Sequence, residues 1–215
     1  MPAKFIFWDW NGTLLDDTAA AVATLNDMLA RRGAPTISEA FYRDNFGFPV
    51  RPFYARIGIA SHDDAEWDEV AREYHDVYAL QARNLNSEAI AALDAADRLG
   101  IRQCVLSALR QDLLESELSR YGIENRFLRV CGADNLYGAG KIERARELAE
   151  FAGGAGGVAI VGDSLHDKEV ADAIGAKCVL CAQGSHSRWR LEKAGAWRTV
   201  DTLLEAVETI GGETW

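Results

Sequence analysis

No stretch of this 215-residue chain is apolar over the length needed to cross a membrane, and its first residues lack the basic and apolar blocks of a signal peptide. They lead directly into a short apolar segment at residues 4–8. We therefore expect no membrane partner and a cytoplasmic location. A chain of this length can bury a substantial core and has room for one domain and a subdomain.

Positive charge is scarce as well. The chain has 23 lysine and arginine residues against 33 aspartate and glutamate residues, and its formal net charge is -10 at pH 7. A surface of this sign repels nucleic acids and anionic membranes. The composition therefore predicts no nucleic-acid partner, and a phosphate site in this chain has to be a local basic spot.

Cysteine is also sparse, with four residues that lie mostly within apolar segments, at positions 104, 131, 178 and 181. Free thiols pack well in such segments, so we expect reduced cysteines in the core. Cys178 and Cys181 have a spacing that occurs in zinc sites. Residues three apart on a strand point to opposite faces, however, which prevents them from converging on one ion.

The chain does contain a regular alternation of short apolar runs and helical patterns. The apolar runs occupy residues 4–8, 101–106, 128–132, 157–162 and 176–181. Short runs of this kind are typical of buried strands, and the helical patterns between the later ones predict right-handed crossovers. The predicted fold class is therefore α/β, with a doubly wound parallel sheet covered by helices on both faces.

Residues 16–83 interrupt this alternation, because strand signals vanish there and helical periodicity dominates. We expect a helical cap inserted over the ends of the strands. Residues 1–15 and 84–215 would then form the core domain, and residues 16–83 the cap domain. The least helical part of the cap spans residues 46–54, which contain two prolines and several aromatic residues.

Polar residues follow the predicted strands at the edge where a parallel sheet brings strand ends together. Asp9 ends the first strand, and Gly12 and Thr13 follow shortly after. Glycine lets the backbone approach an anion closely, and threonine offers a hydroxyl and a backbone donor. Ser107 ends a later strand, and Lys141 opens a helical pattern. Together these residues indicate a site that handles phosphate.

A second acidic segment, Gly162-Asp163-Ser164-Leu165-His166-Asp167, follows the apolar run at residues 157–162. Its spacing places both carboxylates near one face of a first helical turn. Mg²⁺ prefers oxygen ligands and retains waters, so two acids that face Asp9 would suit it. The residues alone leave open a second interpretation, in which Asp163 and Ser164 supply a helix N-cap.

These segments, taken in order, resemble the motifs of the haloacid dehalogenase superfamily, whose members mostly hydrolyse phosphate esters through an aspartyl-phosphate intermediate. The match consists of Asp-x-x-Gly-Thr beginning at Asp9, then Ser107, then Lys141, and finally Gly-Asp-Ser-x-x-Asp ending at Asp167. The resemblance implies a Rossmann-like core with an inserted helical cap, which covers essentially the whole chain.

The resemblance also implies roles for individual residues. Asp9 would be the nucleophile, and Ser107 and Lys141 would hold the phosphoryl oxygens together with the backbone amide of Trp10. A carboxylate is a weak nucleophile toward an anionic phosphate, so the reaction needs this positive charge and these aligned donors. The implied ligands of Mg²⁺ are Asp9, Asp163, Asp167 and the backbone carbonyl of Asn11.

Asn11 departs from the superfamily pattern. In the phosphatases of the superfamily, this position usually holds a second aspartate, which protonates the leaving oxygen and then activates water. An amide cannot carry that proton, and positioned acid–base catalysis contributes about 10²–10⁴-fold. Histidine is the usual side chain for proton transfer near neutral pH, so His166 is a candidate substitute, the alternative being an exposed residue of a first helical turn.

Arg51 lies in the least helical part of the cap. We expect its guanidinium either to bind a second anionic group of the substrate or to remain a surface charge. The ring of Trp10 is expected to pack under the cap or to line the entrance of the site.

The sequence therefore predicts a Mg²⁺-dependent phosphatase that resembles the phosphoglycolate phosphatase-like branch of the superfamily. Its substrate would be a small phosphorylated metabolite, and the protein would be a monomer or homodimer. One alternative is a catalytically weakened phosphate-binding or regulatory protein, because of Asn11. Another is an enzyme that cleaves carbon–halogen or carbon–phosphorus bonds on the same scaffold.

Overall fold

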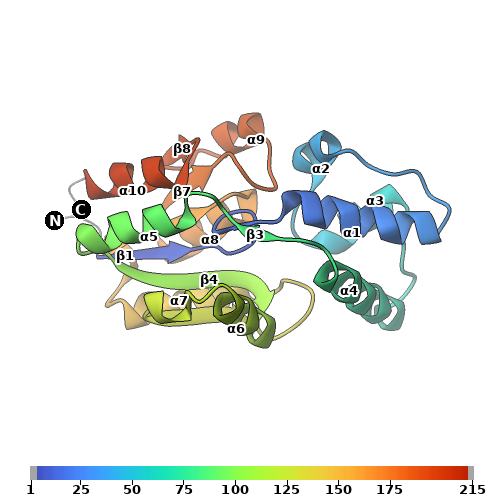
Figure 1. Cartoon of the computed structure of the whole chain (residues 1–215), viewed down its shortest axis with the longest axis horizontal. Coiled ribbons are helices and arrows are strands. Elements are labelled where there is room, and N and C mark those ends of the chain that lie inside the picture. Colours follow the sequence, from blue (N-terminus) through green and yellow to red (C-terminus); the bar gives the residue numbers. More distant parts are fainter. Residues whose placement is uncertain (1–3, 213–215) are drawn as a thin grey trace.

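A six-stranded parallel sheet forms the centre of the computed structural model, which describes residues 4–212 (Figure 1). The strand order is β5-β4-β1-β6-β7-β8. The strands are β1 (Phe5–Trp8), β4 (Arg102–Arg110), β5 (Arg129–Ala133), β6 (Val158–Gly162), β7 (Lys177–Cys181) and β8 (Arg198–Val200). The predicted α/β fold with a doubly wound parallel sheet is confirmed.

Each of the five predicted strands is present, whereas β8 was not predicted. This strand is only three residues long, Arg198–Val200, and only Val200 is buried. Its sequence therefore contains no apolar run. Pairing with the neighbouring strand β7 keeps it in the sheet.

Helices cover both faces of the sheet. One face carries α5 (Ala89–Arg98), α6 (Gln111–Arg120) and α10 (Leu203–Gly211), and the other carries α7 (Lys141–Phe151), α8 (Leu165–Ile174) and α9 (Arg188–Lys193). Short 3-10 helices, η1 (Glu124–Arg126) and η2 (Ala155–Gly157), precede β5 and β6.

Alternate side chains of each central strand enter different cores, as the pleat requires. In β1, Ile6 and Trp8 pack toward α5, α6 and α10, whereas Phe5 and Phe7 pack toward α7 and α8. Cys178 and Cys181 also separate in this way, one into each core, and both are free thiols. The expectation that their side chains point to opposite faces of the strand is confirmed.

Four helices lie between two short strands, β2 (Leu15–Asp16) and β3 (Asn84–Leu85), which pair with each other in antiparallel orientation. The helices are α1 (Thr18–Arg31), α2 (Glu39–Asn45), α3 (Val50–Ile57) and α4 (Asp64–Ala79). We call residues 17–83 the helical insert. It has a core of its own, and Figure 1 shows its helices at one end of the molecule, beyond the sheet.

The segment at residues 46–54 is less irregular than its sequence suggests. Only the part up to Pro49 is non-helical, because α3 begins at Val50. Pro52 lies within the first turn of this helix, where a backbone N–H would have no intrahelical partner and proline is tolerated.

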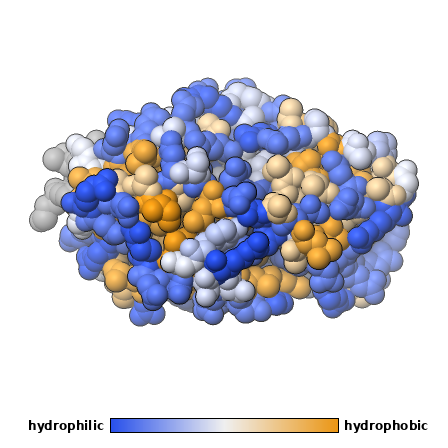
Figure 2. All heavy atoms as spheres, viewed as in Figure 1, coloured by the Kyte–Doolittle hydropathy of each residue, from blue (hydrophilic) through white to orange (hydrophobic). Residues whose placement is uncertain are grey.

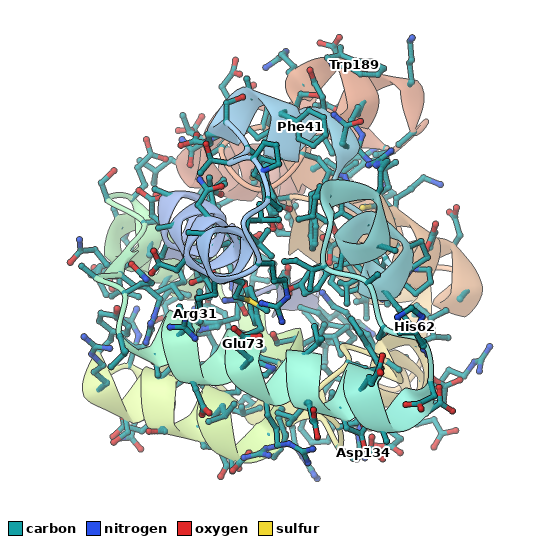
Figure 3. The ribbon with its side chains drawn as sticks, turned by 90° about the vertical axis from the view of Figure 1, so that its right-hand side faces the viewer. Arg31, Phe41, His62, Glu73, Asp134 and Trp189 are labelled. Atoms are coloured by element: carbon teal, nitrogen blue, oxygen red, sulfur yellow. The ribbon has the colours of Figure 1, made fainter. Side chains whose placement is uncertain are left out.

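The insert is attached to the core by polar contacts as well as by the chain. The indole of Trp189 on α9 donates a hydrogen bond to Asp44 at 2.7 Å, and Arg190 donates to the carbonyl of Arg43 at 2.7 Å. Figure 3 shows Trp189 close to the insert residue Phe41, and the pair Arg31 and Glu73 between α1 and α4.

On the face shown in Figure 2, hydrophobic side chains form separate patches among hydrophilic ones. Between residues 4 and 212, no helix has both the length and the apolar character needed to span a membrane.

Candidate active site

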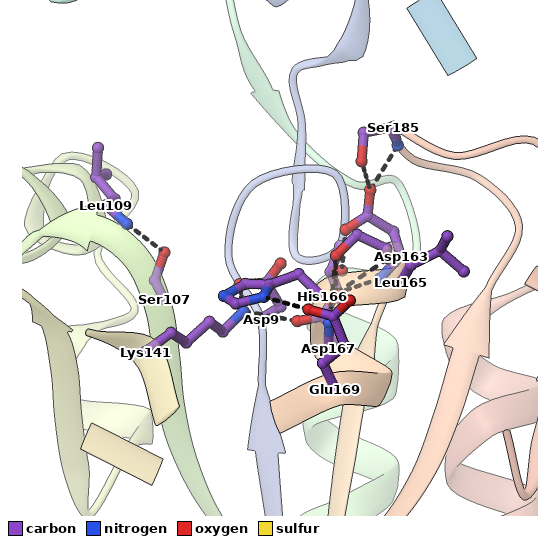
Figure 4. A network of polar contacts seen from close by, with 12 residues as sticks. Asp9, Ser107, Leu109, Lys141, Asp163, Leu165, His166, Asp167, Glu169 and Ser185 are labelled. Carbon is purple, nitrogen blue, oxygen red and sulfur yellow. Dashed lines mark hydrogen bonds and ion pairs between the residues drawn. The ribbon is translucent and has the colours of Figure 1, made fainter. Parts of the chain in front are cut away.

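Three predicted site residues, Asp9, Ser107 and Asp163, lie at one edge of the sheet, on or after three adjacent strands (Figure 4). Asp9 follows β1, which pairs with β4 on one side and β6 on the other. Ser107 lies on β4, and Asp163 follows β6. Lys141, at the start of α7, donates hydrogen bonds to Asp9 Oδ1 at 2.7 Å and to Asp167 Oδ1 at 2.6 Å. All five side chains are buried.

Two glycines allow loops to close around Asp163. Gly12 has a φ of +74°, and a Cβ built there would lie 2.2 Å from Asp163 Oδ2. A Cβ at Gly184 would lie at the same distance from that oxygen, and 2.4 Å from the carbonyl oxygen of Gly12. A larger residue at either position would therefore displace the carboxylate.

The carboxylates at this site outnumber the cations. Oxygens of Asp9, Asp163 and Asp167 lie within 4.8 Å of one another, and Lys141 is the ammonium group between them. Burial and the charge of Asp167 raise the pKa of Asp9 and raise the pKa of Asp163 to about 7. Although burial opposes it, Lys141 lowers the pKa of Asp167. A buried cluster with this excess of negative charge fits a hard divalent cation.

Asp167 also caps a helix. The side chain of Ser164 is the N-cap of α8, and Asp167 completes a capping box by accepting hydrogen bonds from the Ser164 backbone N–H at 3.0 Å and from its hydroxyl at 2.7 Å. The N-cap is therefore Ser164 and not Asp163. The carboxylate of Asp163 instead accepts hydrogen bonds from the hydroxyl of Ser185 at 2.6 Å and from that of Thr13 at 3.3 Å.

Asn11 points its amide away from the carboxylate cluster, toward the insert. Its Nδ2 donates to Asp17 Oδ2 at 2.7 Å and to the hydroxyl of Tyr78 at 2.9 Å. The backbone N–H of Gly12 donates to Asp17 Oδ1 at 2.7 Å, and the Tyr78 hydroxyl donates to the same carboxylate. Burial raises the pKa of Asp17, and these donors oppose the shift.

Arg51 does not reach the site, so its predicted contact with substrate is wrong. Its guanidinium donates to Asp64 Oδ1 at 2.8 Å, to the carbonyl of Asp63 at 2.8 Å and to the hydroxyl of Ser61 at 3.0 Å. The start of α4 presents these acceptors on the outside of the insert, and they hold the arginine there.

Three other predicted residues, Trp10, His166 and Thr13, are also located by the structure. The ring of Trp10 is fully buried in the core and lies 6.1 Å from the ring of Tyr121, so it does not line an entrance. His166 stacks on Phe48 with ring centroids 4.8 Å apart, and its Nδ1 lies 3.1 Å from Glu169 Oε2. Thr13 has no exposed surface, because its side chain is directed at Asp163.

A cavity of about 150 Å³ separates the sheet from the insert. Asp9, Ser107, Lys141 and Asp163 line it on the core side, and the helices α1 to α4 line it on the other side. Figure 4 shows Lys141 extending toward Asp9 from the side of Ser107.

Sequence analysis missed three residues of this site, namely Asp17, Tyr78 and Ser185. Ser185 follows β7 at the same edge of the sheet, so the strand-end argument used for Asp163 would also have found it. Asp17 and Tyr78 had no comparable signal, because they meet only when α1 and α4 of the insert pack together.

A family model described as haloacid dehalogenase-like hydrolase matches residues 6–181. The chain belongs to this family. The match includes the region of every motif described above and the whole helical insert. No curated protein matches this haloacid dehalogenase-like hydrolase.

Solved structures share its fold at low sequence identity. A predicted phosphatase from Clostridium acetobutylicum has a TM-score of 0.83 and 17% identity, over 98% of this chain and 99% of the other. A predicted phosphoglycolate phosphatase from Haemophilus somnus has a TM-score of 0.77 and 17% identity, over 96% and 97%. A haloacid dehalogenase-like family hydrolase from Streptococcus pneumoniae has a TM-score of 0.81 and 16% identity, over 96% and 98%.

Proposed function

We propose that this haloacid dehalogenase-like hydrolase is a Mg²⁺-dependent phosphatase that acts on a small phosphorylated metabolite. The observation that carries the proposal is the buried contact of Lys141 with Asp9 and Asp167, beside the carboxylate of Asp163. An ammonium in this place reduces the repulsion between a carboxylate nucleophile and an incoming phosphate.

In the proposed reaction, a carboxylate oxygen of Asp9 attacks phosphorus, and the bond to the ester oxygen breaks with its electron pair on that oxygen, which takes a proton from solvent water to become the alcohol. Ser107 and Lys141 bind the phosphoryl oxygens, together with the backbone amide of Trp10. Water then attacks the aspartyl phosphate, which releases phosphate and regenerates Asp9. Asp9, Asp163, Asp167 and the carbonyl of Asn11 would hold Mg²⁺, which supplies charge stabilisation for the phosphoryl oxygens.

Asn11 lowers the turnover rate that we expect for this hydrolase. Both contacts of its amide group are made to Asp17 and Tyr78, and an amide has no proton to give to the leaving oxygen. We therefore expect this hydrolase to be slower than an enzyme with aspartate at this position. The second candidate function, binding of phosphate with little turnover, rests on the same residue.

The excess of carboxylates also bears on the third possibility, displacement of halide from carbon. Halide departs without protonation, and that reaction needs no divalent cation. A buried group of three carboxylates with one lysine is complementary to a cation, which favours phosphoryl transfer.

The test is release of inorganic phosphate from a panel of phosphorylated metabolites, with Mg²⁺ and with a chelator. We expect Mg²⁺-dependent turnover that falls by about 10⁴-fold or more in Asp9→Asn. Asp16→Asn is the matched control, because Asp16 is exposed near the same loop. Mg²⁺ binding without turnover in the wild type would instead establish the binding protein.

A further inference from the structure

We infer that the alcohol part of the substrate is uncharged and largely apolar, and that the site discriminates against phosphate esters with a second anionic group. This inference rests on the proposed phosphatase function. It concerns the wall of the cavity that faces Asp9 and Lys141 from the insert.

That wall is built mainly from aromatic side chains. Six of them are Tyr42, Phe46, Phe48, Tyr54, Tyr74 and Tyr78. They pack on one another, with Tyr74 stacked on Tyr78 at 5.6 Å between ring centroids and Phe46 against Phe48 edge-on at 5.6 Å. Leu25 and Val50 add aliphatic surface. A leaving group in this half of the cavity therefore contacts mostly carbon.

Within residues 4–212, the wall offers neither a lysine nor an arginine to a second anionic group. No arginine is among the described residues that line the cavity, and Lys141 is their single lysine. Lys141 already contacts Asp9 and Asp167. Burial lowers the pKa of His75, which keeps its ring neutral near neutral pH, and its Nε2 lies 3.3 Å from the carbonyl of Leu136.

A carboxylate on the leaving group would lose its hydration here without gaining a partner. Burying an unpaired ion is strongly unfavourable, and the carboxylates of Asp9, Asp17 and Asp163 line the same cavity. Arg51, the residue that would have supplied a counter-charge, points to the outside of the insert. The site therefore suits a single phosphoryl group on a neutral carbon skeleton.

A cationic leaving group is also disfavoured, although aromatic rings attract cations. The acid on the insert side is Asp17, and its oxygens already accept hydrogen bonds from Asn11, Gly12 and Tyr78. An ammonium entering this half of the cavity would lose water without reaching an unoccupied carboxylate. The volume of about 150 Å³ is on the order of a cavity that binds benzene, so the carbon skeleton is small.

Three primary alkyl phosphates of similar size test the inference: n-propyl phosphate, phosphoglycolate and O-phosphoethanolamine, each with saturating Mg²⁺. We expect kcat/KM for n-propyl phosphate to exceed that for phosphoglycolate by about 100-fold or more, and to exceed that for O-phosphoethanolamine as well. A wild-type preference for either charged ester would overturn the inference.

A substitution in the wall provides a second test. Val50 lines the cavity at the start of α3. Val50→Arg adds a cation there and is expected to raise the kcat/KM of phosphoglycolate relative to n-propyl phosphate by about 10-fold or more. Val50→Gln is the matched control, similar in length but uncharged, and should leave the ratio near that of the wild type. Equal ratios in both variants would contradict the inference.

Binding measurements separate failure of this inference from failure of the proposed function. If no ester is turned over, the phosphatase proposal fails, and the affinities of the three esters for the Asp9→Asn protein are compared by calorimetry. Tighter binding of n-propyl phosphate would still support an apolar wall. Equal or tighter binding of phosphoglycolate would overturn it.

Discussion

The two walls of the cavity differ in composition and in the way they are built. The core wall includes Asp9, Ser107 and Asp163 at the ends of adjacent parallel strands and Lys141 at the start of α7, together with Leu136 and Tyr137 from the segment before α7. The insert wall consists mainly of rings carried on helices. Under the proposed function, the reacting groups lie at the edge of the parallel sheet, and substrate selection falls to a separate set of helices.

The largest expected effect comes from removing the cation of the core wall. Lys141→Met leaves Asp9 and Asp167 buried without their counter-charge, so we expect the free energy of unfolding to fall by about 3–5 kcal/mol. Urea denaturation without Mg²⁺ measures this loss. Lys168→Met is the control, because Lys168 pairs with the exposed Asp172 and its removal should cost at most about 1 kcal/mol. Equal losses in the two variants would contradict the importance of the buried contact.

The next effect is a pH dependence of the core wall. The pKa of Asp163 is about 7 in the folded protein, whereas an aspartate in an unfolded chain ionises near pH 3.9. The metal-free folded protein thus keeps a proton that the unfolded chain releases. Its free energy of unfolding should fall by up to about 4 kcal/mol as pH rises from about 4 to about 7.

Urea denaturation at a series of pH values measures this slope. Saturating Mg²⁺ should restore stability most at pH 7 and above, where the carboxylates are ionised. Asp163→Asn should flatten the slope of the metal-free protein. A slope of the opposite sign in the wild type, unchanged in Asp163→Asn, would show that the charge of this cluster is compensated in some other way.

A smaller effect on stability is expected at the contact between Asn11 and Asp17, where the core meets the insert. Asn11→Asp places a second carboxylate against Asp17 and removes a donor from it, so we expect a loss of about 1–3 kcal/mol in the free energy of unfolding. The double variant Asn11→Asp with Asp17→Asn exchanges amide and carboxylate and should recover most of this loss. Thermal and urea denaturation of both variants test the exchange.

Activity of the same variants addresses the role of position 11. If the missing proton donor limits turnover, the double variant should be faster than the wild type, by up to about 10²-fold. Asp17→Asn alone is the control, because it keeps Asn11. Equal rates in all these proteins would show that proton transfer to the leaving group does not limit the reaction.

The smallest effect is expected at Arg51. Its partner Asp64 is almost fully exposed, so Arg51→Gln should cost at most about 1 kcal/mol. The ratio of kcat/KM values for phosphoglycolate and n-propyl phosphate should stay unchanged. Arg146→Gln, on the surface of α7, is the control. Specific loss of phosphoglycolate turnover in Arg51→Gln would show that this side chain does reach the substrate.

The two walls also differ in how much of them the sequence predicted. Asp9, Ser107 and Asp163 follow buried apolar runs, which are strong local signals, and parallel pairing then determines that they meet. The proximity of Lys141 was expected from the resemblance, and its contacts with Asp9 and Asp167 show it in place. The catalytic roles of these residues stay predictions.

Most contacts of the insert wall could not be predicted from the sequence. The hydroxyl of Tyr78 meets Asp17 across 61 positions of the chain, and no local pattern encodes such a contact. Arg51 was misplaced for a related reason. Its proximity to aromatic residues in the sequence suggested a binding loop, whereas α3 begins at Val50 and the start of α4 supplies acceptors on the outside. Helix packing, and not local composition, decided where these side chains point.

The pairing of β2 with β3 has a mechanical consequence. Both passages of the chain between sheet and helices run side by side through Leu15 and Leu85, joined by backbone hydrogen bonds. The four helices of the insert are thus joined to the sheet by one paired connection and not by two separate ones. Under the proposed function, movement of the insert away from the sheet to admit an ester would bend the chain at this paired connection and break the hydrogen bonds from Trp189 and Arg190 to the insert.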